Sequence, residues 1–106
     1  PRRLAFGRGP LPAASELELL DGALQHELAR LGRENVQSLL LEGGPTLAGA
    51  FFRAGFVDKL LLFVAPALSG EGPGTAADLL EPVTLSRLSS RPVGQDVLLT
   101  AYVHEP

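Results

Sequence analysis

Five consecutive residues, Glu42 to Thr46, have the types and the order that could bind a phosphate group. Gly43 and Gly44 lie between a run of leucines and a predicted helix start, and residues without side chains let a ligand approach the backbone closely. The first turn of a helix has unpaired N–H groups and a partial positive charge, which favour an anion. Thr46 adds a hydroxyl donor. The pattern predicts a phosphate-binding turn, but glycines that serve only a sharp bend would give the same pattern.

Two common nucleotide-binding patterns are missing from this turn. Its spacing is not the G-x-G-x-x-G of dinucleotide-binding folds, and it lacks the lysine of a P-loop. Glu42 is the second candidate, because it ends an apolar run, where a carboxylate is costly to bury without a partner. It could line a substrate pocket, or it could reach solvent or cap the next helix.

The composition argues against several other kinds of site. The chain has 106 residues and no cysteine, so disulfides and cysteine-bound metals are excluded. His26 and His104 are far apart and have no neighbour at metal-ligand spacing, so we expect no metal site. We predict that His26 is a solvated helix residue and that His104 belongs to a frayed end.

The charge balance and the chain ends indicate the class of protein. Nine Lys and Arg residues against twelve Asp and Glu give a net charge of −3, which argues against a nucleic-acid partner. No apolar run approaches the roughly 20 residues that span a bilayer, and no signal peptide is evident, so we expect no membrane partner. The absence of cysteine suits a cytoplasmic protein. Because residues 1–3 form an abrupt start without methionine, we expect a piece of a longer protein.

Two strongly apolar segments are predicted to be neighbouring strands. The run at 36–41 is typical of a strand covered on both faces, and a similar run at 58–65 is stopped by Pro66. A helix is predicted between them, so the two strands should be parallel with a right-handed crossover, as in a βαβ unit.

The connecting helix is predicted at residues 45–54. Pro45 suits the first helical position, and Gly55 suits the helix end. Leu47 and Phe51 are four residues apart, so they should share one face of the helix and point toward the sheet.

The remaining elements are one helix and three strands. Ser15, with Glu18 three residues later, fits a capping box for a helix, and Asp21 is an alternative N-cap. This helix should run to about Leu31 and end at Gly32, which can take a left-handed conformation. Further strands are predicted at residues 3–6, 83–88 and 95–103.

Four segments resemble one known family. They are Leu39–Ala48 (LLLEGGPTLA), Ala54–Leu60 (AGFVDKL), Val64–Leu68 (VAPAL) and Gly94–Val97 (GQDV). In these residues and their spacing the chain resembles the reductase domain of the bifunctional riboflavin-biosynthesis deaminase/reductase. The resemblance covers roughly residues 20–103.

The resemblance implies an α/β fold with a dihydrofolate-reductase-like mixed sheet, of which this chain would be only the C-terminal, βαβ-containing half. Residues 1–106 would then be a single, partial reductase domain. The family reductase uses NADPH to reduce 5-amino-6-(5-phosphoribosylamino)uracil to the ribitylamino product. The first half of the family domain and the deaminase domain have no counterpart here, so the expected partners include the missing N-terminal half and the ribosylaminouracil phosphate substrate.

The resemblance also assigns roles to the turn. The cofactor-binding residues of the family correspond here to Gly43, Gly44, Pro45, Thr46 and Leu47. Glu42 matches the position that faces the nicotinamide and the substrate.

Two other functions remain open. The chain could be a non-catalytic βαβ module for dimerisation or nucleotide binding, or a dihydrofolate-reductase relative with another pterin-like substrate. The apolar strands have few elements to cover them, so we also expect a homo-oligomer.

Overall fold

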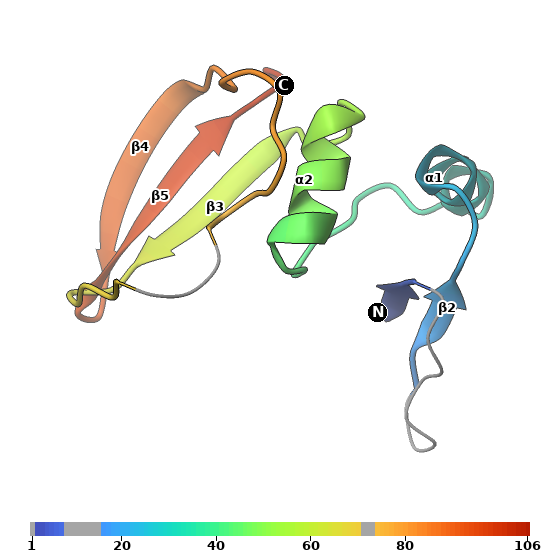
Figure 1. The fold of residues 1–106 in the computed structure, drawn as a ribbon, viewed down its shortest axis with the longest axis horizontal. Helices are drawn as coiled ribbons and strands as arrows, with labels where there is room; N and C mark the ends of the chain where they lie inside the picture. Colours follow the sequence, from blue (N-terminus) through green and yellow to red (C-terminus); the bar gives the residue numbers. More distant parts are fainter. Residues whose placement is uncertain (1, 8–15, 71–73) are drawn as a thin grey trace. The chain divides into compact units, whose positions relative to one another are not determined.

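The computed structural model describes residues 2–7, 16–70 and 74–106. Contacts within the chain divide it into two units, Pro1–Leu40 and Leu41–Pro106. Parallel and antiparallel strand pairs are both present together with α-helices, as predicted for a mixed α/β fold (Figure 1).

The first unit contains two short strands and a helix. Strand β1 (Leu4–Phe6) pairs in parallel with β2 (Glu18–Leu20), and helix α1 (Leu24–Arg33) follows (Figure 1). Leu20 and Leu31 are each 2% exposed and form the core of this unit. The predicted strand at residues 3–6 is therefore confirmed as β1.

Arg2 links three parts of the first unit. Its guanidinium lies 3.0 Å from a carboxylate oxygen of Glu18 and 2.9 Å from one of Glu34. The hydrogen bonds from Arg2 hold the pKa of Glu18 below its usual value. Because Arg2 precedes β1, while Glu18 starts β2 and Glu34 is the C-cap of α1, this pair of contacts ties both strands to the helix end.

The predicted start of the first helix is wrong. Glu18 begins strand β2, where it is paired with Leu4, and α1 starts at Leu24 after an N-cap, Ala23, whose side chain makes no capping bond. Ser15 lies outside the described residues, and Asp21 is not the N-cap. Pairing with β1 outweighs the local capping pattern, because tertiary contacts commonly override such weak signals.

The predicted end of that helix is displaced as well. Gly32 lies inside α1, and Asn35 takes the left-handed conformation with a φ of 67°. The amide of Val36 donates to the carbonyl of Leu31, and the amide of Asn35 donates to that of Gly32. These two bonds are those of a Schellman motif, in which asparagine is the usual alternative to glycine.

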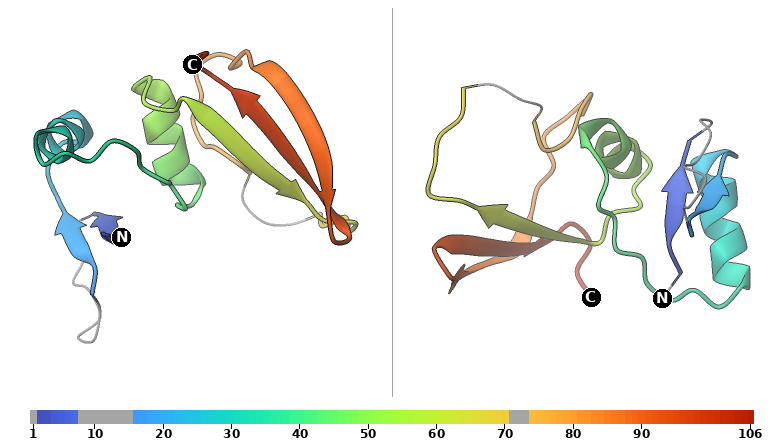
Figure 2. Two further views of the ribbon diagram at one scale, coloured as in Figure 1. Left: turned by 180° about the vertical axis from the view of Figure 1, so that it is seen from behind. Right: turned by 90° about the horizontal axis from the view of Figure 1, so that it is seen from below.

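The second unit contains a helix and an antiparallel sheet. Helix α2 (Pro45–Arg53) is followed by strands β3 (Lys59–Val64), β4 (Ser86–Val93) and β5 (Asp96–Tyr102). The sheet order is β3-β5-β4, and α2 lies beside one face of the sheet (Figures 1 and 2). The predicted strands at 58–65 and 95–103 are thus confirmed as β3 and β5.

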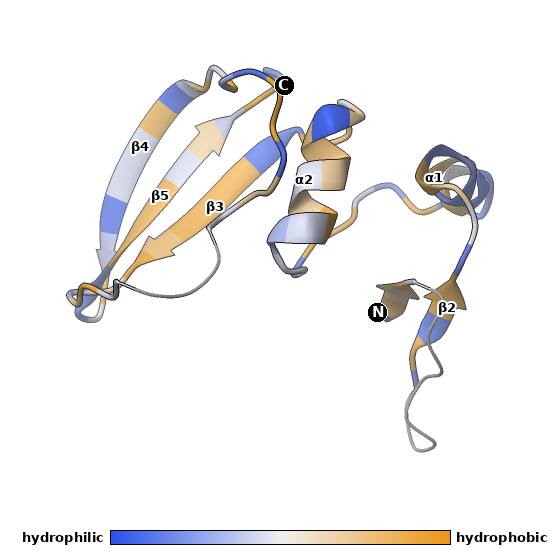
Figure 3. Cartoon of the chain, in the orientation of Figure 1, coloured by the Kyte–Doolittle hydropathy of each residue, from blue (hydrophilic) through white to orange (hydrophobic). Residues whose placement is uncertain are grey.

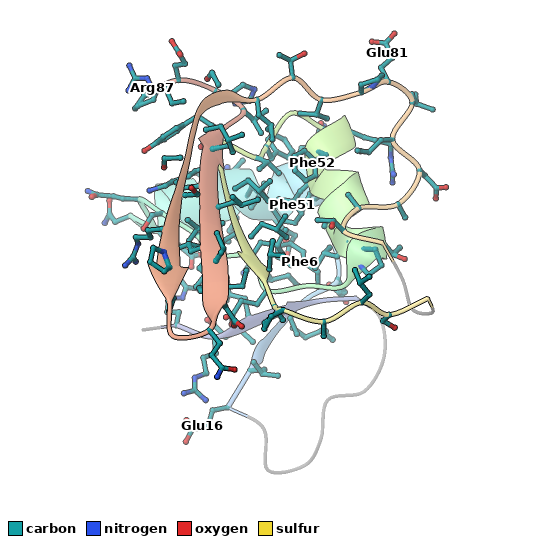
Figure 4. The ribbon with its side chains drawn as sticks, turned by 90° about the vertical axis from the view of Figure 1, so that its left-hand side faces the viewer. Phe6, Glu16, Phe51, Phe52, Glu81 and Arg87 are labelled. Atoms are coloured by element: carbon teal, nitrogen blue, oxygen red, sulfur yellow. The ribbon has the colours of Figure 1, made fainter. Side chains whose placement is uncertain are left out.

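Helix α2 has the predicted ends. Pro45 occupies its first turn, and Gly55, with a φ of 76°, follows its end. Phe51 is 3% exposed and projects from α2 on the side of the sheet (Figure 4), whereas Leu47 is half-buried. Ala54, at the end of the predicted helix, is the exposed C-cap residue.

The predicted βαβ unit is wrong. Residues 36–41 form no strand, and β3 pairs antiparallel with β5 instead of parallel with that segment. A strand needs a neighbour to accept and donate its backbone hydrogen bonds, and no described strand pairs with 36–41. The segment also crosses from one unit to the other, and Leu40 is 74% exposed.

Strand β4 differs from its predicted range of 83–88. It runs from Ser86 to Val93 and is irregular between Ser86 and Ser89, where Arg87 has a φ of 52°. Its position is set by a hairpin in which Val93 pairs with Asp96 across a two-residue loop. Gly94 has a φ of 61° at the first loop position, where such turns favour glycine.

Apolar side chains remain accessible on the sheet. Leu61 is 47% exposed and Phe63 is 58% exposed, and because they are two residues apart they share one face of β3. The ribbon of β3 is almost uniformly hydrophobic (Figure 3). In the described part of the chain, no helix combines the length and apolar character required to cross a membrane.

Candidate functional site

The candidate phosphate turn precedes helix α2. Gly44 is the N-cap residue of α2, and Pro45 follows it in the first helical turn. Gly44 has no side chain that could cap this helix start, and Pro45 has no N–H group. The amide groups of Thr46 and Leu47, next along the turn, are therefore donors at a helix N-terminus, where an anion is favoured.

The two glycines of the turn have different roles in the fold. A Cβ added at Gly43 would lie 2.9 Å from Cδ2 and 3.2 Å from Cβ of Leu47, so glycine there leaves room for that leucine. A Cβ added at Gly44 would meet no atom within 4 Å. Gly44 also has a φ of −74° and a ψ of 178°, which any residue can adopt. The bend alone therefore does not require glycine at position 44.

Most residues of the turn are accessible. Glu42, Gly43, Gly44 and Thr46 are exposed, whereas Pro45 is half-buried. The expectation that Glu42 ends a buried strand is wrong, because residues 36–41 form no strand. Glu42 is exposed in this structure, and its place beside a substrate stays a prediction.

A second segment crosses helix α2 and was missed by the sequence analysis. We call Ala76–Asp78 the crossing segment. The amide of Ala77 donates a 2.9 Å hydrogen bond to the carbonyl of Pro45, and Arg53 Nη1 donates to the carbonyls of Ala77 at 2.9 Å and Asp78 at 3.3 Å.

Gly49 allows this close approach. A Cβ built there would overlap the carbonyl oxygen of Ala77. A glycine inside a helix costs about 1 kcal/mol relative to alanine, so Gly49 was the signal in the sequence that another part of the chain packs against α2.

The histidines lie in different units. His26 is exposed on α1, as predicted. His104 is not a frayed residue: its Nδ1 lies 2.9 Å from Oδ1 of Asp58, and its amide donates to the Asp58 carbonyl at 3.2 Å. This contact joins the end of the chain to the start of β3. Over residues 2–7, 16–70 and 74–106, no group of three or more His, Cys, Asp or Glu residues could hold a metal ion.

Comparison with known sequences gives one consistent family. Residues 13–99 match the RibD C-terminal domain. The riboflavin biosynthesis protein RibD of Mycobacterium tuberculosis is 47% identical over 68 residues, which are 58% of this chain and 20% of that protein. The RibD protein of Corynebacterium ammoniagenes is 38% identical over 80 residues, which are 68% of this chain and 24% of that protein.

Solved structures share the fold. RibD of Acinetobacter baumannii superposes with a TM-score of 0.75 at 23% identity, covering 96% of this chain and 37% of that one. A riboflavin biosynthesis protein of Shewanella sp. PV-4 superposes with a TM-score of 0.79 at 22% identity, covering 97% of this chain and 59% of that one. The chain thus spans a minor part of its curated relatives and about a third to three-fifths of these structures.

Proposed function

Because the chain belongs to the RibD C-terminal domain family, we propose that it supplies the cofactor side of an NADPH-dependent reductase of riboflavin biosynthesis. The reaction is the reduction of 5-amino-6-(5-phosphoribosylamino)uracil to its ribitylamino product. Residues 1–106 are then part of a single reductase domain, and the rest of that domain, N-terminal to this chain in a longer protein, is its partner.

The observation that carries the proposal is the open position at Gly44. The fold does not need glycine there, yet a side chain would project into the space in front of the uncapped helix start. A pyrophosphate needs both a bare backbone and free amide donors at such a place. NADPH, when bound, supplies the hydride.

Each residue of the turn would have a separate role in binding the cofactor. Gly43 and Gly44 would lie beneath the pyrophosphate, and the amides of Thr46 and Leu47 would donate to it. Thr46 is exposed, and its hydroxyl would add one more donor. Pro45 sets the first helical turn.

Calorimetric titration of NADPH into the full-length protein tests the proposal. We expect one saturable site and NADPH oxidation that depends on the uracil substrate. A protein that is folded but shows no heat of binding would contradict it.

Glu42 is proposed to face the nicotinamide and the substrate. It precedes the two glycines and is exposed, so its carboxylate is free to meet a bound molecule. For Glu42→Gln we expect NADPH affinity within about twofold of the wild type and a kcat lower by at least about tenfold, since a positioned acid or base contributes this much or more.

Steady-state kinetics with a parallel NADPH titration checks that kcat falls while the NADPH affinity is kept. Glu81→Gln is the matched control, because Glu81 is an exposed glutamate that lies outside the turn. Unchanged kcat in Glu42→Gln would remove Glu42 from the site.

The exposed apolar side chains on β3 favour a second role, as an interaction module. Leu61 and Phe63 share one face and are about half exposed, and large accessible apolar side chains on a sheet are typical of an interface. We propose self-association through this face, independently of catalysis.

Sedimentation velocity over a range of concentrations tests self-association. Phe63→Lys is expected to shift the distribution toward monomer, because a charge would be desolvated at the interface. Leu80→Lys is the control, because Leu80 is 90% exposed but lies outside the sheet. A wild-type protein that is monomeric at every concentration would exclude the interface.

A further inference from the structure

We infer that Gly49 and Arg53 are positioning residues for the candidate phosphate turn, Glu42 to Thr46, and that they act through the crossing segment at Ala76–Asp78. The inference rests on the proposed function, because it assigns a purpose to a contact that ends at Pro45, the first residue of α2. Both residues lie outside the turn, on the part of α2 that follows it.

The first turn of α2 has few bonds that hold it in place. Its N-cap, Gly44, has no side chain, and Pro45 has no N–H group. Within the helix, the amide of Ala48 donates to the Gly44 carbonyl at 3.0 Å. Among the described residues, the backbone donor that reaches this turn from outside the helix is the amide of Ala77, 2.9 Å from the Pro45 carbonyl.

The crossing segment contacts three residues on one face of the helix. Pro45, Gly49 and Arg53 are spaced by four, so they lie one above another on the same face of α2. Each of them meets Ala77: Pro45 through its carbonyl, Gly49 through its missing Cβ, and Arg53 through its guanidinium. Through these three contacts with Ala77, the crossing segment holds the first two turns of α2 in place. We call this set of contacts the brace.

Arg53 binds two successive carbonyls of the segment. Its Nη1 lies 2.9 Å from the oxygen of Ala77 and 3.3 Å from that of Asp78. Asp78 has a φ of 58°, in the left-handed region that non-glycine residues rarely adopt.

The brace matters for binding because the donors to the cofactor lie in the same turn. If the segment is displaced, the Pro45 carbonyl loses its outside partner and the uncapped first turn can fray. Cofactor binding must then order the amides of Thr46 and Leu47 again. The free energy that this ordering costs makes the binding free energy less favourable. Chemistry at the nicotinamide should be unaffected once the cofactor is bound.

NADPH titration and steady-state kinetics on the full-length protein test the inference. Gly49→Ala should raise the Kd for NADPH by at least about tenfold, because the methyl group displaces Ala77 from Pro45. Gly32→Ala is the matched control: Gly32 also lies inside a helix, but a Cβ there would meet nothing within 4 Å, so its Kd should stay at the wild-type value.

Substitutions of Arg53 keep the test decisive if Gly49→Ala does not fold. Arg53 is exposed, so Arg53→Ala should fold and raise the Kd about threefold to tenfold, with a matching rise in KM and an unchanged kcat at saturating NADPH. Arg53→Lys keeps a donor and should recover part of the affinity. Arg91→Ala, an exposed arginine on β4, should bind like the wild type.

The outcomes separate this inference from the proposed function. If the Gly49 and Arg53 variants bind NADPH like the wild type while Gly44→Asp does not, the brace is irrelevant and the turn still binds the cofactor. A loss of stability without any change in Kd also overturns the inference. If the wild type itself does not bind NADPH, the proposed function fails and the inference fails with it.

Discussion

Gly44→Asp is expected to abolish detectable NADPH binding while the melting temperature stays at or slightly above that of the wild type. The fold tolerates the change, because the added Cβ meets no atom within 4 Å and the φ of −74° suits any residue. Aspartate is also a better N-cap than glycine, by a few tenths of a kcal/mol. The same carboxylate would repel a pyrophosphate by about 1–4 kcal/mol at about 4 Å, depending on exposure.

Two further substitutions separate the causes of this loss. Gly44→Asn has nearly the same size and capping ability without the charge, so it should weaken binding less than Gly44→Asp does. Thr46→Ala should lose a single hydrogen bond, about 0.5–1.5 kcal/mol of binding free energy. Calorimetric titration beside melting curves measures both quantities. If Gly44→Asp melts earlier but binds NADPH normally, the glycine serves only the bend.

Residues 1–106 by themselves are expected to show no NADPH oxidation that depends on the uracil substrate. Hydride transfer needs the sugar and the nicotinamide held about 3–3.5 Å apart, and this positioning accounts for effective molarities of roughly 10⁵–10⁸ M. The chain offers an exposed turn for the cofactor but corresponds to only 37% of the Acinetobacter RibD chain. The groups that hold the substrate are proposed to lie in the remainder.

The comparison is made in one assay, with the full-length protein as the positive control. The isolated residues are tested at matched concentration, with NADPH and substrate in excess, after circular dichroism has shown that they are folded. Steady turnover by the pure 106-residue chain would show that these residues hold the substrate as well.

The sequence predicted the elements that carry their own boundary signals. Helix α2 was found because Pro45 marks its first turn and Gly55 its end, and both act through the backbone alone. Strand β3 was found from its apolar run, and β5 from its regular alternation. For the candidate site, the sequence predicted the helix start that follows the two glycines, and both glycines are exposed; phosphate binding there stays a prediction.

Features that depend on distant partners could not be predicted. The runs at 36–41 and 58–65 look alike in sequence, but among the described residues only the second has a paired strand, β5, to complete its hydrogen bonds. Glu18 looked like a capping residue until pairing with β1 was known. The crossing segment has no pattern of its own, since it is defined by where Ala77 meets Gly49 and Pro45.

The antiparallel sheet also sets an order in which the second unit can fold. Strands β4 and β5 are joined by a two-residue loop, and hairpins of this kind close in about 1–10 μs. Strand β3 must instead find β5 across the long connection from Val64 to Val97, and that closure loses far more chain entropy. The most apolar strand is therefore the last to be paired. During synthesis or refolding it is the segment most exposed to pairing with another chain, so aggregation during folding should begin at β3.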